Sequence, residues 1–368
     1  MSDQYAYWLA SMQGISSYVC RQLFSVCRTA EEIYGLSPSM LEKVPDLTQK
    51  NRARILDAKK TWDLDGAWQQ FAASGMSLTS WEEPSYPPQF RELADAPYGI
   101  FYRGSLPQPD GFRVAVVGAR MCSEYGRDMA REIARELAKH DVAVVSGMAG
   151  GIDAAGHRGA MDSDGETYAV FGCGVDICYP NYHRQLYYEI ERHGGLLSEY
   201  PPGTRPLPYH FPKRNRIISV LSDVVIIIEA KEKSGSLITA DFAVEQGRDI
   251  YVLPGRVTDA LSSGCNKLIA QGAGIILSVE DLMEELFLEA RRKRPDTACD
   301  KNFAKIHNFS LEKEEQLVYG CLGILPTGFE DILKMTGLNT QTVSRILAAL
   351  MQNGYIEEIF KNHYKIRT

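Results

Sequence analysis

Short apolar runs alternate with amphipathic stretches through the middle of the chain. Most of the runs are separated by stretches with helical periodicity, such as Glu124–Lys139, Gln185–Arg192 and Leu237–Gln246. Apolar strands that alternate with helices predict a parallel sheet covered on both faces, in a doubly wound α/β domain over roughly residues 80–290. The predicted strands are Arg113–Val117, Val142–Ser146, Thr167–Phe171, Leu196–Ser198, Val224–Glu229, Ile250–Leu253 and Ile275–Leu277.

The segments on either side of this domain have helical patterns. Residues 309–368 predict three amphipathic helices and a small hairpin, an arrangement typical of a winged helix-turn-helix. Residues 14–20 resemble half of a helix-hairpin-helix, in which Gly14 would bring backbone amides near a phosphate, and a plain helical packing module explains them equally well. The N-terminal region predicts five short helices, over Tyr5–Met12, Ser17–Val26, Thr29–Tyr34, Pro38–Lys43 and Thr48–Lys59.

Two connecting segments complete the predicted organisation. Prolines recur between residues 80 and 110, which breaks regular structure and indicates an ordered connector. A basic and polar stretch that begins at Arg291 indicates a linker. We therefore expect a helical domain over 1–65, the connector and α/β domain over 66–290, a linker over 291–308 and a winged-helix domain over 309–368.

Composition narrows the class of protein. The 368 residues are 45% hydrophobic and 24% charged, as is ordinary for a globular protein, and no apolar run approaches the ~18 residues that a membrane span needs. We read no signal peptide at the start, and the eight cysteines form no CxxC pair. We therefore expect a cytoplasmic protein with free thiols, no metal and no membrane partner.

Glycine-rich turns follow four of the predicted strands. They contain Gly118-Ala119-Arg120, Ser146-Gly147, Gly172-Cys173-Gly174 and Ser234-Gly235-Ser236. The carboxyl ends of parallel strands share one edge of the sheet, and a helix that starts there offers unpaired N–H groups. Four such turns predict a rim that binds phosphates. No GxGxxG follows the first strand and no GxxxxGK[ST] occurs, so we expect neither NAD nor ATP as a cofactor.

The formal charge of −7 requires any nucleic-acid site to be a local basic patch. Residues 201–220 contain Arg205, Lys213, Arg214 and Arg216 and no acidic residue. Aromatic residues accompany them: Tyr209 and Phe211 in this segment, and Tyr179 and Tyr182 in another rim loop. Arginines that follow a backbone and aromatics that stack on bases are typical of a groove for single-stranded nucleic acid. A solvated loop anchored by its aromatics explains the composition equally well.

These residues together resemble the family of DprA, also called Smf, over roughly 85–280. Each motif is weak alone, but they occur in the order typical of that family. They are Val117–Arg120, Ser146-Gly147 with Gly151–His157, Gly172–Gly174 with Tyr179-Pro180, Ser198–Pro201, Phe211–Ile218, Ser234–Ala240, Pro254-Gly255 and Gly264–Ile269.

The resemblance implies an extended Rossmann-like fold that binds single-stranded DNA without sequence preference. It also implies a homodimer, loading of the recombinase RecA onto incoming strands in natural transformation, and no catalytic turnover. The predicted N-terminal helices are similar to a SAM or helix-hairpin-helix module. Together with the predicted C-terminal winged helix, they match a common layout of this family.

The resemblance also assigns roles to residues. Arg120 would contact a phosphate beside Gly118, and Ser146 and Gly147 would present the second turn. Asn215 would fix a loop or reach a base or sugar. The other expected contacts are Lys213, Arg214 and Arg216 along the path of the strand, backbone and hydroxyl donors of Ser234, Gly235 and Ser236, and stacking by Tyr179, Tyr182 and Phe211.

The chain departs from the family pattern in three respects. Val220 stands where a glycine is common, which indicates a change of packing. Asn181 stands where a lysine is common, and whether Arg184 replaces that phosphate contact is open. Residues 309–368 hold six basic and seven acidic residues, which favours a protein-contact or regulatory role over DNA binding.

Two other functions compete with this interpretation. A phosphoribohydrolase of the LOG type would use acids such as Asp153, Glu199, Glu229, Asp241 and Glu245, but its PGGxGTxxE-like loop is replaced by Ser234–Ala240. A winged-helix transcriptional regulator would read bases from Thr340–Leu350, which offers only Gln341, Ser344 and Arg345.

Overall fold

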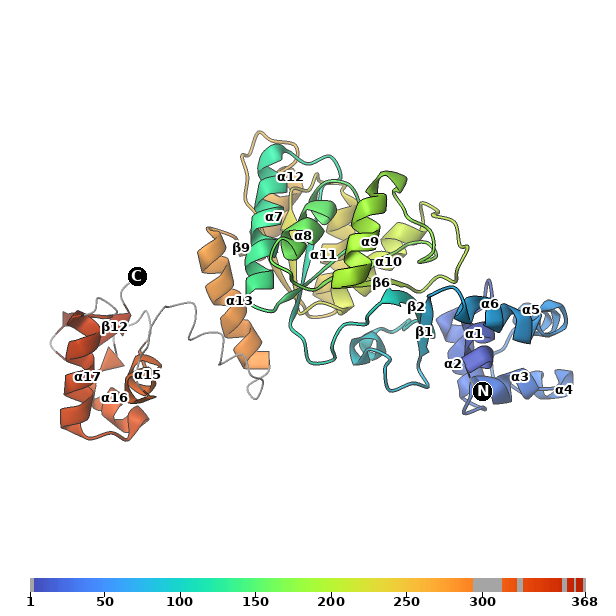
Figure 1. Cartoon of the computed structure of the whole chain (residues 1–368), viewed down its shortest axis with the longest axis horizontal. Helices are drawn as coiled ribbons and strands as arrows, with labels where there is room; N and C mark the ends of the chain where they lie inside the picture. Colours follow the sequence, from blue (N-terminus) through green and yellow to red (C-terminus); the bar gives the residue numbers. More distant parts are fainter. Residues whose placement is uncertain (1–2, 294–312, 323–326, 353–355, 361, 367–368) are drawn as a thin grey trace. The chain divides into compact units, whose positions relative to one another are not determined.

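A computed structural model describes residues 3–293, 313–322, 327–352, 356–360 and 362–366 (Figure 1). The chain divides into two compact units, residues 1–293 and 294–368. The predicted limits of the four parts remain predictions. No helix among the described residues is both long enough and apolar enough to span a membrane.

A nine-stranded sheet forms the centre of the first unit. Its strand order is β1-β2-β6-β5-β4-β3-β7-β8-β9, and the seven strands from β6 to β9 in this order are parallel. The sequence-predicted strands lie in this parallel part, within a residue or two. The bounds are β1 Ser77–Ser80, β2 Gly99–Gly104, β3 Arg113–Gly118, β4 Ala143–Ser146, β5 Thr167–Val170, β6 Gly194–Ser198, β7 Val224–Ile228, β8 Asp249–Val252 and β9 Gly274–Ile275.

The two antiparallel strands were not predicted from the sequence. β1 pairs with β2, and β2 pairs with β6 from Phe101–Ser198 to Gly104–Gly195. The Pro-rich connector thus contains the strand that extends the sheet, and a 3-10 helix, η1, Pro88–Glu92. Phe90 and Phe101 are fully buried there, so the connector packs into the core.

Helices cover both faces of the parallel part, as the alternating pattern predicted. Because parallel crossovers are right-handed, α7, α8 and α9 cover one face, and α10, α11 and α12 cover the other (Figure 1). The order reverses between β3 and β7, the place where doubly wound sheets bind ligands. The bounds are α7 Glu124–Lys139, α8 Ile152–Met161, α9 Arg184–His193, α10 His210–Val220, α11 Gly235–Glu245 and α12 Ser263–Ala270.

The N-terminal helices form their own core, which continues into the sheet. Trp8, Leu23 and Ile33 are fully buried in this cluster, which also includes Tyr98 beside β2. At the turn after α1, Gly14 has a φ of +74°, and Arg54 donates to its carbonyl oxygen over 2.8 Å. The bounds are α1 Asp3–Ser11, α2 Ser17–Phe24, α3 Ala30–Gly35, α4 Pro38–Leu41, α5 Gln49–Thr61 and α6 Leu64–Ala72.

The second unit has a small core and an antiparallel sheet of order β10-β12-β11. Its bounds are α15 Lys313–Tyr319, β10 Thr327–Gly328, α16 Phe329–Thr336, α17 Thr340–Gln352, β11 Ile356–Phe360 and β12 His363–Ile366. The winged-helix assignment itself stays a prediction. In the first unit, α13 spans Val279–Lys293, so helix continues past the predicted start of the linker, and residues 294–308 lie outside the described residues.

Candidate nucleic-acid interface

A cavity of about 270 Å³ lies at the carboxyl ends of β3 and β7, where the strand order reverses. We call it the rim cavity. Eight of the sequence-predicted site residues line it: Gly118, Arg120, Phe211, Arg214, Asn215, Ser234, Gly235 and Ser236. The fold therefore brings together turns that are more than 100 residues apart in the sequence.

The turn after β3 needs glycine because other backbone groups approach it closely. A Cβ atom on Gly118 would lie 1.8 Å from the carbonyl oxygen of Ile228, and one on Gly151 would lie 2.2 Å from that of Ala119. Gly151 also has a φ of +74°, which favours glycine. This packing holds Arg120 at the mouth of the cavity, where its guanidinium lies 5.8 Å from the centre of the Phe211 ring. The Arg120 side chain is exposed.

Arg214 is buried in the wall of the rim cavity. Its guanidinium donates to the carbonyl oxygen of Gly147 over 3.0 Å and to that of Val170. A Cβ atom on Gly147 would lie 2.5 Å from this guanidinium, so the glycine makes room for the arginine. Asp153 accepts from the backbone N–H of Gly147 over 3.2 Å. Burial lowers the pKa of Arg214 to about 10, and the attraction of Asp153 opposes that change.

Arg216 lies away from the rim cavity, where it is buried and pairs with the exposed Asp95 and the buried Glu199. Its guanidinium is 2.8 Å from Asp95 and 2.8 Å from Glu199, and only 4% of its side chain is exposed. Lys213, whose side chain is half-exposed, lies 3.4 Å from Glu199 and does not line the cavity. Helix α10 therefore contains three of the four cations of the basic stretch, and of these three only Lys213 is exposed. The fourth, Arg205, precedes the helix and is exposed as well.

Two other predicted contacts hold the turns from inside. Ser146 is fully buried, and its hydroxyl donates to the carbonyl oxygen of Val116 over 2.7 Å, so its side chain does not reach the surface. Asn215 donates to the carbonyl oxygen of Gly235 over 3.1 Å. This hydrogen bond ties α10 to the first residue of α11.

The loop before α11 presents several donors to the cavity. Ser234 is the N-cap of α11, and its hydroxyl lies 2.7 Å from that of Ser236. A Cβ atom on Gly235 would meet no heavy atom within 4 Å, so the backbone there is open to a ligand. The first N–H groups of a helix carry a partial positive charge, which attracts phosphate oxygens.

The predicted stacking residues lie around the same rim. The Tyr179 and Phe211 rings are 5.3 Å apart at their centres, and Tyr179 is 40% exposed. Tyr182 is 76% exposed, and its hydroxyl would lie 2.8 Å from a Cβ atom on Gly150. Asn181 and Arg184 are exposed nearby, and within the described residues neither lines the rim cavity.

Three of the five acids of the competing enzyme hypothesis have structural partners. Asp153 binds backbone amides, and Glu199 pairs with Arg216. Glu229 accepts from the backbone N–H of Ser123 over 2.8 Å and also from its hydroxyl. In the described part of the chain, only Asp153 among the five acids lines the rim cavity.

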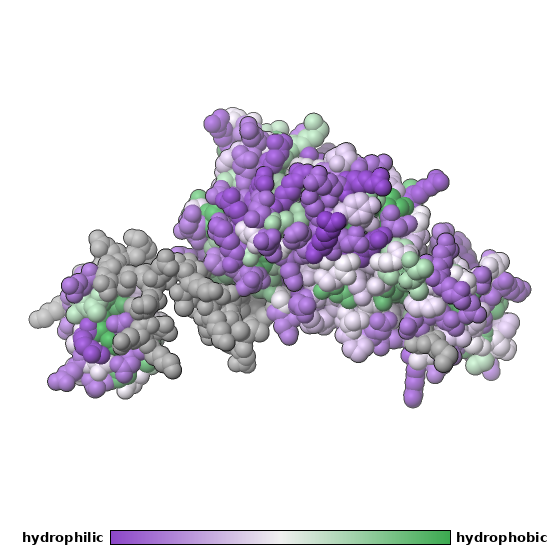
Figure 2. Space-filling model, in the orientation of Figure 1, coloured by the Kyte–Doolittle hydropathy of each residue, from purple (hydrophilic) through white to green (hydrophobic). Residues whose placement is uncertain are grey.

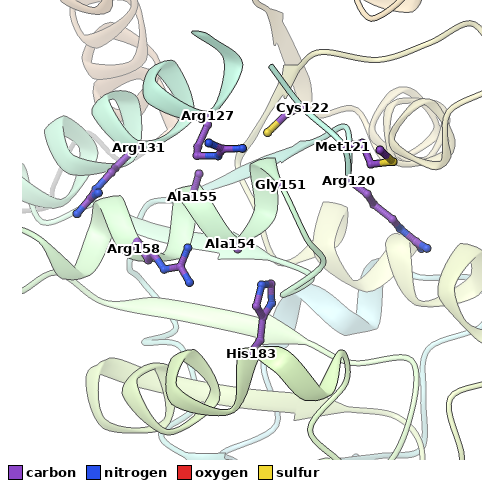
Figure 3. Close-up of a pocket in the computed structure, with 10 residues that line it drawn as sticks. All are labelled: Arg120, Met121, Cys122, Arg127, Arg131, Gly151, Ala154, Ala155, Arg158 and His183. Atoms are coloured by element: carbon purple, nitrogen blue, oxygen red, sulfur yellow. The ribbon is translucent and has the colours of Figure 1, made fainter. Parts of the chain in front are cut away.

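A second cavity, of about 340 Å³, was not predicted from the sequence. It lies beside α7 and α8, and we call it the helix cavity (Figure 3). Arg120, Arg127, Arg131 and Arg158 line it together with His183. Two of these arginines are four residues apart on α7, a spacing that could have indicated a shared face, but their neighbour on α8 is distant in sequence.

The chain is similar to proteins of one family. The family described as DNA recombination-mediator protein A matches residues 77–287. The DNA processing protein DprA of Streptococcus pneumoniae is 44% identical over 200 residues, which are 54% of this chain and 71% of that protein. Protein Smf of Synechocystis is 33% identical over 291 residues, which are 77% of this chain and 73% of that protein.

Solved structures agree with these matches. The crystal structure of DprA from Streptococcus pneumoniae has a TM-score of 0.67 at 33% identity, and covers 77% of this chain and 97% of its own. DprA from Helicobacter pylori has a TM-score of 0.53 at 30% identity, and covers 58% of this chain and 96% of its own. The Helicobacter protein is described as having a unique single-stranded DNA binding mode.

Proposed function

The chain belongs to the DNA recombination-mediator protein A family, and from this we propose that it binds single-stranded DNA without sequence preference as a recombination mediator. One observation carries the proposal. The rim cavity holds an exposed arginine, an open helix N-terminus and an aromatic ring at one place. These are the groups that bind a phosphate and the face of a base.

Each part of the rim has a role in this proposal. Arg120 and the N-terminus of α11 bind backbone phosphates, and Phe211, Tyr179 and Tyr182 stack on bases. Arg214 adds positive charge from the wall while its hydrogen bonds hold the turn after β4. Lys213 contacts the strand outside the cavity, whereas Ser146, Gly147, Asn215 and Arg216 position the elements behind it. Phosphate contact and stacking carry no base information, so binding is independent of sequence.

We infer the partners from the same family membership. The protein acts on DNA in the cytoplasm, loads RecA onto single strands in natural transformation and forms a homodimer, without catalytic turnover. Asp153, the acid in the rim cavity, is held by the backbone amides of Gly147 and Ala149 and is therefore a structural group. The acidic balance of residues 309–368 supports a protein-contact role for that part.

A titration of a fluorescent single strand of about 30 nucleotides, longer than one binding site, tests the proposal. Fluorescence anisotropy measures the dissociation constant for the strand and for its duplex, at several salt concentrations. We expect the single strand to bind at least about tenfold more tightly, since stacking needs unpaired bases. Equal affinity for the two forms, or no binding of either, would contradict the proposal.

A further inference from the structure

Three of the four arginines of the helix cavity, all but Arg131, differ from the other arginines near them in their charge partners. Arg103 pairs with Glu191, Arg248 with Glu92, and Arg135 lies near two glutamates on its own helix. By contrast, no carboxylate among the described residues lies within 4.0 Å of the charged nitrogens of Arg120, Arg127 or Arg158. Like charges that gather without a counter-charge repel each other, and a bound anion relieves that repulsion.

The close approach of two helices builds this cavity. A Cβ atom on Gly159 would lie 2.2 Å from the carbonyl oxygen of Arg131, so the glycine lets α8 pack against α7. Arg127 and Arg131 then lie one turn apart on α7, and Arg158 on α8 faces the same space (Figure 3). Ala154 and Ala155 form a floor of small side chains, which leaves room for a ligand above the helix.

The chemistry of the lining residues favours phosphate. Guanidinium groups bind phosphate oxygens in pairs of parallel hydrogen bonds, and no carboxylate lines the cavity within the described part of the chain. Arg131 is pinned by Asp162 at 2.5 Å, which leaves Arg127 and Arg158 as the cations available to a ligand. His183 is 7% exposed, with Nδ1 at 3.1 Å from the carbonyl oxygen of Met148, so Nε2 is the ring atom left to face the cavity. Hydrophilic side chains also cover the region of α7, α8 and α9 in Figure 2.

We propose that the helix cavity is a second phosphate-binding site, which takes phosphates of a DNA strand as the strand leaves the rim cavity. Arg120 lines both cavities, and its side chain points away from Arg127 and Arg158 (Figure 3). Its guanidinium lies 5.8 Å from the centre of the Phe211 ring. That a DNA strand supplies the phosphate rests on the proposed function. A free nucleotide or inorganic phosphate offers the same chemistry.

A double variant, Arg127→Ala with Arg158→Ala, tests the site. Arg135→Ala is the matched control, because Arg135 is on the same helix, lies outside the cavity and contacts glutamates of its own helix. The probes are a strand of about 6 nucleotides, enough for the rim alone, and one of about 30, with and without a 5′-phosphate. A mononucleotide and inorganic phosphate are titrated separately by calorimetry.

If the phosphates come from the DNA strand, the double variant should bind the long strand at least about tenfold more weakly for each arginine lost. The slope of log affinity against log salt should be shallower by about 1.4, and binding of the short strand should be unaffected. A loss confined to 5′-phosphorylated strands identifies a terminal phosphate. A loss confined to mononucleotide or inorganic phosphate supports the site but contradicts the strand as its source. If the double variant matches Arg135→Ala with every probe, the site is overturned. If wild type binds no strand, the proposed function fails, while the calorimetry still decides whether the cavity binds phosphate.

Discussion

The arginines of α10 and those around α7 and α8 are the same residue type in opposite surroundings. Arg214 and Arg216, neighbours in the basic stretch, are buried and bonded to carbonyl oxygens or carboxylates. Arg120, Arg127 and Arg158, scattered through an acidic chain, are exposed. Two arginines of a local run of positive charge thus became part of the interior, while Arg205 and Lys213 of the same run stayed exposed. Dispersed arginines made the surface that can meet an anion. Arginines whose charge is paired inside the protein stabilise the fold, whereas arginines without a carboxylate partner can bind an anionic ligand.

The largest expected effect is a loss of stability on removing a buried cation. Arg216→Ala leaves Glu199, which is 6% exposed, without its main partner, and should lower the free energy of unfolding by about 3–5 kcal/mol. Urea unfolding followed by fluorescence measures this. Adding Glu199→Gln to Arg216→Ala should recover part of this lost stability. The control variant Arg135→Ala should change the free energy of unfolding by less than ~1 kcal/mol. If Arg216→Ala unfolds at the same free energy as wild type, the buried arginines of α10 do not stabilise the fold more than the exposed arginines do.

A somewhat smaller loss is expected from crowding the turn that carries Arg120. Gly118→Ala places a Cβ atom 1.8 Å from the Ile228 carbonyl oxygen, which forces β3 and β7 apart. Overpacking of this kind costs about 1–3 kcal/mol, which thermal unfolding would detect. Gly35→Ala is the control, because a Cβ atom there meets no heavy atom within 4 Å. Equal melting temperatures for the two variants would show that the turn is not held as tightly as described.

The aromatic part of the rim should affect binding and not stability. Tyr182 is 76% exposed, so Tyr182→Ala should leave the melting temperature unchanged. If a base stacks on the Tyr182 ring, Tyr182→Ala should weaken single-strand binding by about 1–3 kcal/mol. Tyr182→Phe keeps an aromatic ring and should bind as tightly as wild type. Tyr18, which is 64% exposed on the N-terminal helices, is the control for loss of an exposed tyrosine. Unchanged affinity in Tyr182→Ala would remove this residue from the interface.

The pattern of the sequence predicted the parallel part of the sheet well, because strands buried on both faces consist of apolar residues. β1 and β2 were missed, since Ser77–Ser80 is polar and prolines surround Gly99–Gly104. β2 is placed by its pairing with β6, which lies about 100 residues farther along the chain, and β1 is placed by its pairing with β2. The turns of the rim were predictable, because glycine follows a strand in each of them and most of these glycines have close neighbours that a side chain would displace.

The burial of the α10 arginines was not predictable in the same way. Asp95, which pairs with Arg216, is 121 residues away, and the carbonyl oxygens that accept from Arg214 come from β5 and the turn after β4. A basic, aromatic segment looks alike in sequence whether its cations point to solvent or to such partners. The helix cavity was missed for a related reason, since Arg158 joins Arg127 only through the packing of α8 on α7.

The salt dependence of single-strand binding in Arg120→Ala tests the central claim most directly. For single strands, the slope of log affinity against log salt changes by about 0.7 for each phosphate contact. Wild type, Arg120→Ala and Arg135→Ala would be compared by anisotropy with one strand at several salt concentrations. We predict that Arg120→Ala alone binds more weakly, with a slope shallower by about 0.7 and an unchanged melting temperature. Identical slopes and affinities for all three proteins would contradict the placement of the DNA at the rim.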